Sequence, residues 1–178
     1  QQKKFRKQTG LFTVEGVKTV CELLNSDLNT TAIYSTEEFD FLKNVDSQLV
    51  HFIKEKELNR ISGLKTPNKI LAVAQIPTVE KIDWDSQLIL LLDGIRDPGN
   101  MGTMIRTAKW FGVSTILCSD DCADAYTQKV VQSTMGALFQ VQIKYVELPS
   151  IIDECRENKF ELIGAAMEGK SIYAFTAP

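Results

Sequence analysis

Asn100 and Arg106 are the two residues whose types and spacing could do chemistry in this sequence. They lie in LLDGIRDPGNMGTMIRTAKWFG (91–112), where an apolar run meets a turn rich in proline and glycine. A guanidinium can hold a phosphate through two hydrogen bonds and stabilise a developing oxyanion, whereas an amide offers both a donor and an acceptor. The pattern suggests a substrate site. The alternative is that Asn100 only caps a helix and Arg106 is a surface cation.

A strand and a helix are needed to position this pair. LILLLD (88–93) is a continuous apolar run, typical of a strand covered on both faces. A helix is expected from about residue 100 to residue 111, because Pro98 suits a helix start and Gly112 a helix end. Either Asp97 or Asn100 could cap its first turn.

The expected helix has one apolar stripe, which should pack on the sheet. The stripe consists of Met101, Met104, Ile105, Ala108 and Phe111. Arg106 falls off this stripe and Asn100 lies at its edge, so both could face a cleft. In open α/β sheets, ligands gather beyond the carboxyl ends of the strands, which is where this helix begins.

Strands alternate with helices along the rest of the chain, which predicts an α/β fold. Further strands are expected at 11–16, 31–35, 49–54, 69–77, 113–119, 137–146 and 160–167. Further helices are expected at 17–24, from Thr36, at 55–63 with Gly63 as a left-handed cap, at about 124–135 and at 148–158. The polar segment 78–87 is interpreted as a linker between a small α/β domain (1–77) and a second, doubly wound α/β domain (88–178).

Composition excludes several classes of protein. No apolar run approaches the roughly 18 residues of a membrane span, and the N-terminus lacks the apolar core of a signal peptide. Four scattered cysteines and a single histidine argue against a metal site, a disulfide framework or a histidine-based triad, and favour a cytoplasmic protein with reduced thiols. The glycine pattern matches neither G-x-G-x-x-G nor a P-loop, which disfavours a dinucleotide site.

The first ten residues form a basic arm without any acidic residue. Its cations are Lys3, Lys4, Arg6 and Lys7. Such an arm can neutralise RNA phosphates and release counterions, although a solvated terminal helix remains the alternative. The net charge of −3 restricts any RNA binding to a local patch.

The pattern D-x-I-x-D-P-x-N-x-G-x-x-x-R-T-A-x-x-x-G in residues 93–112 closely resembles the first motif of the SpoU/TrmH family of RNA 2′-O-ribose methyltransferases. KVVQSTMGALF (129–139) resembles a second family segment through Lys129, Ser133, Gly136, Ala137 and Phe139. KKFRKQTGLFTVEG (3–16) resembles the L30e-like substrate-binding domain often fused to these enzymes.

The resemblance implies an enzyme that transfers a methyl group from S-adenosylmethionine to a ribose 2′-hydroxyl of rRNA or tRNA, and rRNA is the expected substrate. It implies an L30e-like domain followed by a trefoil-knot SPOUT domain, and a homodimer formed through the latter. Arg106 would be the catalytic arginine, with Asn100 as its partner. The segment 163–169 would lie beside the cofactor, with Ala165, Ala166 and Met167 as binding candidates. The remaining family motifs would lie beyond Pro178, so the SPOUT domain is expected to be incomplete.

Two other hypotheses stay open at this point. A non-catalytic RNA-binding protein is supported by the basic arm, the L30e-like segment and the missing motifs. A nucleotide-binding α/β enzyme of another class is supported by the glycine-rich turn alone. Guanosine in large-subunit rRNA is the substrate expected by analogy within the family.

Overall fold

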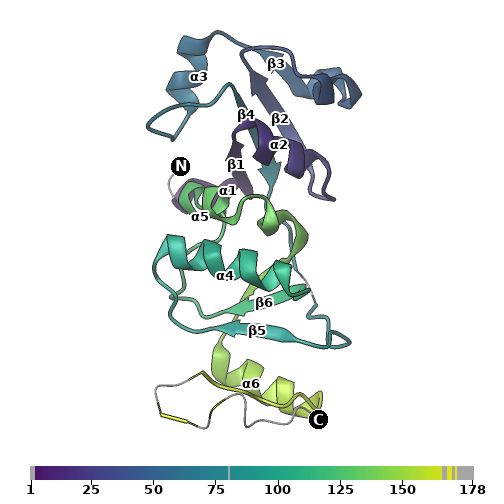
Figure 1. The fold of residues 1–178 in the computed structure, drawn as a ribbon, viewed down its shortest axis with the longest axis vertical. Coiled ribbons are helices and arrows are strands. Elements are labelled where there is room, and N and C mark those ends of the chain that lie inside the picture. The colour runs from purple at the N-terminus through teal and green to yellow at the C-terminus, as the bar shows by residue number, and fades with distance from the viewer. Residues whose placement is uncertain (1–2, 80, 166–167, 170, 172–178) are drawn as a thin grey trace. The chain divides into compact units, whose positions relative to one another are not determined.

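The computed structural model describes residues 3–79, 81–165, 168–169 and 171 (Figure 1). The chain divides into two compact units, residues 1–146 and 147–178. Within the described residues, no helix is both long enough and apolar enough to cross a membrane.

The first unit begins with helix α1 (Lys3–Thr9) and a four-stranded sheet in the order β1-β4-β2-β3. Its strands are β1 (Leu11–Glu15), β2 (Thr30–Ser35), β3 (Val50–Phe52) and β4 (Ile70–Gln75), and helix α2 (Val17–Leu24) packs against β1 and β4. β4 runs antiparallel to β1 and β2, whereas β2 and β3 are parallel. Alternate residues of β1, Phe12 and Val14, are fully buried, as the two-residue period of a strand requires.

Two predictions about the connections in this sheet are wrong. The helix expected from Thr36 is a 3₁₀ helix, η1 (Asp40–Asn44), followed by a second short one, η2 (Ser47–Leu49). Helix α3 (Glu55–Ile61) ends in an extended residue, Ser62, rather than at a left-handed Gly63. The chain leaves α3 extended because Ser62 and Gly63 both donate hydrogen bonds to the buried carboxylate of Glu15.

The same unit contains a second sheet, in the order β5-β6-β7, with all strands parallel. Its strands are β5 (Ile89–Leu92), β6 (Thr115–Cys118) and β7 (Gln142–Tyr145). Strand β6 is buried throughout, whereas Leu90 and Leu91 of β5 are only half-buried. Strand β5 is therefore less buried than its continuous apolar run predicts, and it is an edge of this sheet in the described part of the chain.

Helix α4 (Pro98–Trp110) follows β5, and helix α5 (Gln128–Thr134) follows β6. Helix α5 contacts both α4 and β1, and so lies between α4 and the first sheet (Figure 1). It begins about four residues later than predicted, because residues before it form a turn in which the Asp124 carboxylate accepts a hydrogen bond from Tyr126 N and Thr127 caps the helix.

The strand predicted at 137–146 begins only at Gln142. Residues Ala137–Gln140 form a 3₁₀ helix, η3. Met135 and Gly136 precede it with φ angles of 50° and 91°, which turn the chain sharply after α5.

The second unit contains helix α6 (Leu148–Glu157), close to its predicted bounds. The buried strand predicted at 160–167 is wrong for the residues that the structure describes. Residues 160–165 have no regular structure and 161–165 are exposed, whereas 166 and 167 lie outside the described residues. A strand requires a neighbour that pairs with its backbone groups, and an apolar run by itself does not supply one.

Candidate active site

The turn between β5 and α4 is attached to the loop that follows β6. Gly94, with φ of 61°, donates its backbone N–H to Ser119 Oγ at 2.9 Å. Ser119 Oγ in turn donates to Asp121 Oδ1 at 2.7 Å, and Arg96 Nη2 bonds Asp121 Oδ2 at 2.8 Å. These hydrogen bonds from Ser119 and Arg96 lower the pKa of Asp121. The network therefore fixes where α4 begins relative to β6.

The cap of α4 is Asp97, which settles one of the alternatives left open by the sequence. Its carboxylate Oδ1 accepts a hydrogen bond from Asn100 N at 2.8 Å, and Pro98 takes the first helical position. The Asn100 side chain is exposed and makes no hydrogen bond with any residue that the structure describes. Because capping does not use its amide, Asn100 is available for a substrate.

The apolar face of α4 is shorter than the sequence suggests. Met101, Ile105 and Ala108 are buried as predicted, but the side chain of Phe111 is 75% exposed. The helix ends before Phe111, and Gly112, with φ of 77°, reverses the chain. Val113 N then bonds Ala108 O, and Val113 takes the buried position instead.

Arg106 is exposed on α4, as predicted, and no ion pair engages it within the described part of the chain. Asn100 and Arg106 are six residues apart on one helix, a spacing at which side chains do not face each other. The structure therefore makes both residues accessible but does not bring them into contact. If they act on one substrate, that substrate has to span them.

The two motif segments meet where α4 packs on α5. Ser133 Oγ lies 2.8 Å from Lys129 O, 3.0 Å from Val130 O and 3.4 Å from Pro98 O. A Cβ on Gly102 would overlap the side chain of Ser133, so a glycine is needed for this close approach. The sequence shows both small residues, but not that they touch.

Comparison with known proteins identifies the chain at this point. The model of the SpoU rRNA methylase family matches residues 87–178, and that of an MRM3-like substrate-binding domain matches residues 1–72. The chain belongs to the SpoU rRNA methylase family. Asn100, Gly102 and Arg106 lie within the stretch that the SpoU family model matches.

Relatives of this SpoU chain include two curated rRNA methyltransferases. The 23S rRNA (guanosine(2553)-2′-O)-methyltransferase RlmP of Bacillus subtilis is 31% identical over 172 residues, which cover 96% of this chain and 68% of that protein. The mitochondrial rRNA methyltransferase 3 of Mus musculus is 30% identical, with 78% of this chain and 36% of that protein covered. The chain therefore spans about a third of the length of the mitochondrial relative.

Two solved structures resemble it closely. A putative RNA methyltransferase of the TrmH family from Porphyromonas gingivalis matches with a TM-score of 0.87 and 32% identity, covering 99% of this chain and 71% of that one. An AdoMet-bound rRNA methyltransferase from Sinorhizobium meliloti matches with a TM-score of 0.74 and 26% identity, covering 88% and 62%. The predicted α/β fold of the SpoU type is confirmed.

A buried carboxylate, not predicted from the sequence, connects the first sheet of this SpoU chain to α5. The side chain of Glu15 accepts hydrogen bonds from Ser62 Oγ at 2.5 Å, Gly63 N at 3.0 Å and Gln128 Nε2 at 2.6 Å. Its backbone oxygen accepts a fourth from Gln132 Nε2 at 2.7 Å. Since α5 also packs on α4, Glu15 helps to hold the first sheet to the helix layer that carries Arg106.

The basic arm of the SpoU chain is helix α1, and its four cations are not equivalent. Lys3, Lys4 and Lys7 are exposed. Arg6 is only 5% exposed, and its guanidinium Nη2 lies 2.7 Å from Asp124 Oδ2. Arg6 therefore differs from the solvent-facing cation that the sequence suggested, because it anchors α1 to the loop before α5.

The proposed cofactor residues of the SpoU chain are only partly described. Ala165 is exposed in an irregular segment, and Ala166 and Met167 lie outside the described residues. A Cβ added to the neighbouring Gly164 would meet nothing within 4 Å. The backbone at Gly164 and Ala165 is thus open, although the neighbouring Ile163 is a large side chain that is 60% exposed.

Proposed function

We propose that the full-length protein transfers a methyl group from S-adenosylmethionine to a ribose 2′-hydroxyl of rRNA. The observation that carries the proposal is the pair of exposed polar residues on α4, Asn100 and Arg106, at the motif positions of a SpoU family chain. The Bacillus relative is named as a guanosine 2′-O-methyltransferase of 23S rRNA, which supports guanosine in large-subunit rRNA as the target.

Arg106 would position the RNA and stabilise charge rather than accept the proton. Its guanidinium can hold the phosphate next to the target ribose by two hydrogen bonds and lower the energy of the oxyanion that develops. A guanidinium gives up its proton only at a large energetic cost, which disfavours Arg106 as the base. The proton of the 2′-hydroxyl would therefore pass to an RNA phosphate or to water, while Asn100 holds the ribose in line with the methyl donor.

S-adenosylmethionine would supply an electrophilic methyl group on sulfur. The Sinorhizobium neighbour is described as AdoMet-bound, which supports this donor. Ala165, Ala166 and Met167 are proposed to lie beside it, because they follow the family's order of segments. The small side chains of Ala165 and Ala166 would let the adenosine approach the backbone.

The domain organisation and assembly form part of the same proposal. Residues 1–77 would be the L30e-like domain, 78–87 the linker and 88–178 part of a trefoil-knot SPOUT domain; the two family matches, at 1–72 and 87–178, support these bounds. A homodimer through the second domain is supported by Trp110 and Phe111, which are 85% and 75% exposed beside each other. Light scattering of the full-length protein measures the mass of this assembly.

Neutralising the exposed lysines of α1 is expected to weaken RNA binding. In the triple variant Lys3→Gln/Lys4→Gln/Lys7→Gln, the plot of log affinity for RNA against log salt concentration should have a slope shallower by about 2. Each lost phosphate contact lowers the slope by about 0.7 for single-stranded RNA. Fluorescence anisotropy with an rRNA fragment measures the slope. Lys43→Gln is the control, because Lys43 is already paired with Asp40. A slope that stays the same would make α1 an ordinary solvated helix.

Mass spectrometry of rRNA from a deletion strain tests the activity itself. The loss of one 2′-O-methyl mark, restored by the wild-type gene, is the expected result, and an unchanged set of marks would refute the proposal. Calorimetry with S-adenosylmethionine on the full-length protein separates an enzyme from a protein that only binds RNA. Binding in the micromolar range is expected of the enzyme. The cytoplasm remains the predicted compartment.

A further inference from the structure

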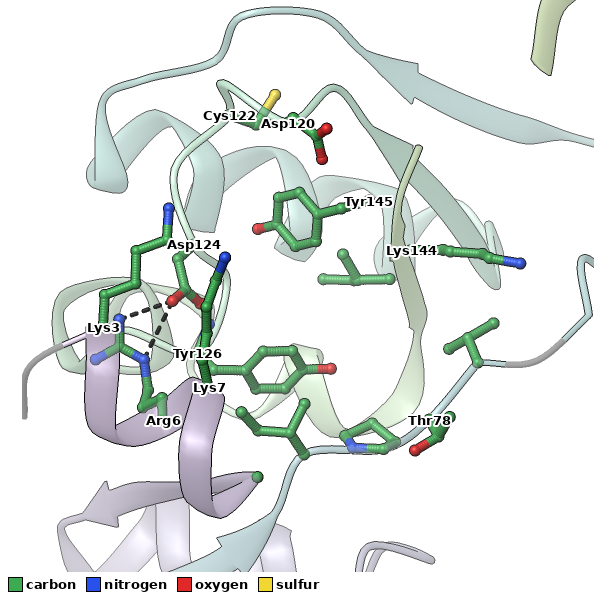
Figure 2. A pocket seen from close by; sticks show the side chains of 15 residues that line it. Lys3, Arg6, Lys7, Thr78, Asp120, Cys122, Asp124, Tyr126, Lys144 and Tyr145 are labelled. Carbon is green, nitrogen blue, oxygen red and sulfur yellow. Dashed lines mark hydrogen bonds and ion pairs between the residues drawn. The ribbon is translucent and has the colours of Figure 1, made fainter. Parts of the chain in front are cut away.

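A cavity of about 500 Å³ lies within the first unit, away from the residues assigned to methyl transfer (Figure 2). It is formed by α1, the segment after β4, the loop between β6 and α5, and β7. Neither Asn100 nor Arg106 lines it. Its volume falls in the range of roughly 300 to 1,000 Å³ that small-molecule sites occupy. Nothing in the proposed chemistry uses it.

One end of the cavity is cationic. Lys3 and Lys7 line it from one face of α1, four residues apart, and Figure 2 shows both side chains extending along the same side. Both are exposed, and neither has an ion pair within the described residues. Arg6 also lines the cavity, but its charge is matched by Asp124. An uncompensated pair of ammonium groups of this kind favours an anion.

In the middle of the cavity, the largely buried side chain of Tyr126 presents a hydroxyl that no described residue engages. Tyr126 is 6% exposed, and its ring is held edge-on against Phe12 at 5.1 Å between centroids. In the part of the chain that the structure describes, its hydroxyl makes no hydrogen bond, and Figure 2 shows it directed among the lining residues. Burial raises the pKa of Tyr126, so the hydroxyl stays protonated and is a donor.

The hydroxyl of the neighbouring Tyr145, by contrast, has two hydrogen-bond partners within the protein. Its hydroxyl accepts a hydrogen bond from Ala125 N at 2.8 Å and donates one to Ala123 O at 2.7 Å. The hydroxyl of Tyr126 differs, because no group of the described residues satisfies it and it reaches the cavity. It is therefore a donor that an acceptor on a ligand in the cavity can take up.

The remaining residues that line the cavity add an apolar surface and a carboxylate to its cationic end. Ile76, Pro77 and Ile143 provide an apolar wall, and the exposed carboxylate of Asp120 lies apart from the lysines (Figure 2). A nucleotide has a matching sequence of groups, namely an anionic phosphate, a flat heterocycle and the N–H and O–H donors of its base and ribose.

We infer that this cavity binds one nucleotide of the RNA substrate, outside the site of methyl transfer. Its phosphate lies between Lys3 and Lys7, with the Tyr126 hydroxyl donating to a phosphate or sugar oxygen. The base packs on the apolar wall, and Asp120 accepts a hydrogen bond from a base or ribose donor. The identification of the ligand as RNA rests on the proposed function. The cavity would then recognise the RNA substrate at a second place, in addition to the ribose that is methylated.

Single substitutions in the full-length protein test the site. Lys3→Gln, Lys7→Gln and Tyr126→Phe are each expected to raise the dissociation constant of the rRNA fragment and the KM for RNA by about tenfold, the loss of one charge-assisted or buried hydrogen bond. The kcat at saturating RNA and the affinity for S-adenosylmethionine should not change. Lys4→Gln is the matched comparison, because Lys4 is an exposed lysine of the same helix that does not line the cavity. It should lose only one general phosphate contact, a clearly smaller effect than that of Lys3→Gln or Lys7→Gln.

Several outcomes would overturn the inference. Equal effects of Lys4→Gln and Lys3→Gln would mean that only the general charge of α1 matters, and an unaffected Tyr126→Phe would remove the buried donor from the site. Guanosine monophosphate, followed by NMR on the wild type and Tyr126→Phe, distinguishes the source of the nucleotide. If Tyr126→Phe no longer binds guanosine monophosphate but keeps the wild-type affinity for RNA, the cavity binds a free nucleotide and the inference fails.

The inference and the proposed function can fail separately. A wild-type protein that methylates RNA, with cavity variants that match it in KM, refutes the cavity alone. A wild-type protein without transfer activity, with cavity variants that lose RNA affinity, refutes the activity and keeps the cavity as an RNA site. Thermal unfolding of every variant checks that the affinity losses are not losses of folded protein.

Discussion

Replacing Arg106 with alanine is expected to lower the kcat of methyl transfer by at least about 100-fold, the size of effect seen when one donor to a developing oxyanion is removed. The fold should tolerate the change, because Arg106 is exposed and lies off the buried face formed by Met101, Ile105 and Ala108. Affinity for S-adenosylmethionine should therefore remain near that of the wild type. Steady-state assays of the full-length protein at saturating RNA measure kcat, and calorimetry measures the affinity for the cofactor.

Two further variants sharpen this result. Lys109→Ala removes another exposed cation of α4 and should leave kcat within about twofold of the wild type. Arg106→Lys keeps the charge but not the planar two-point contact, so most of the loss should remain. A fully active Arg106→Ala enzyme would contradict the role proposed for this side chain.

Replacing Glu15 with alanine is expected to reduce the free energy of unfolding by about 3 kcal/mol. The carboxylate is only 2% exposed and accepts hydrogen bonds from Ser62 Oγ, Gly63 N and Gln128 Nε2. Alanine would leave these donors without their acceptor in a site where water has little access. It would also loosen the junction between the first sheet and α5.

Urea denaturation followed by circular dichroism measures this loss. Glu37→Ala is the matched control, since the ion pair of Glu37 with Lys69 is exposed and should contribute no more than about 1 kcal/mol. A double-mutant cycle of Glu15→Ala with Gln128→Ala isolates the contact across the junction. A loss below about 1 kcal/mol for Glu15→Ala would mean that other contacts hold the sheet to α5.

Local patterns predicted the site helix well because its signals act over only a few residues. Pro98 sets the first turn by its fixed backbone angle, and Gly112 permits the left-handed residue that ends the helix. The apolar period placed Met101, Ile105 and Ala108 in the core. It failed at Phe111, where the helical period had already ended.

The predictions that failed depended on partners distant in the sequence. Gly63 departs from a helix cap because its N–H bonds Glu15, 48 residues away. Arg6 is buried because its guanidinium pairs with the carboxylate of Asp124, 118 residues away. The apolar segment 160–165 is not a strand in the described residues, since the pairing that defines a strand comes from outside it. Neither the spacing nor the types of these residues contain that information.

The sequence by itself therefore determined the alternation of strands and helices, the SpoU motif and the identity of Asn100 and Arg106 as candidate site residues. Only the tertiary structure decided that Asp97 caps α4 and leaves the Asn100 amide available, that Gly102 packs on Ser133, and that a nucleotide-sized cavity opens behind α1. The physical reason is the distance along the chain over which each interaction acts. Backbone preferences and apolar period are set by neighbours along the chain, whereas burial, pairing of polar groups and cavities are set by neighbours in space.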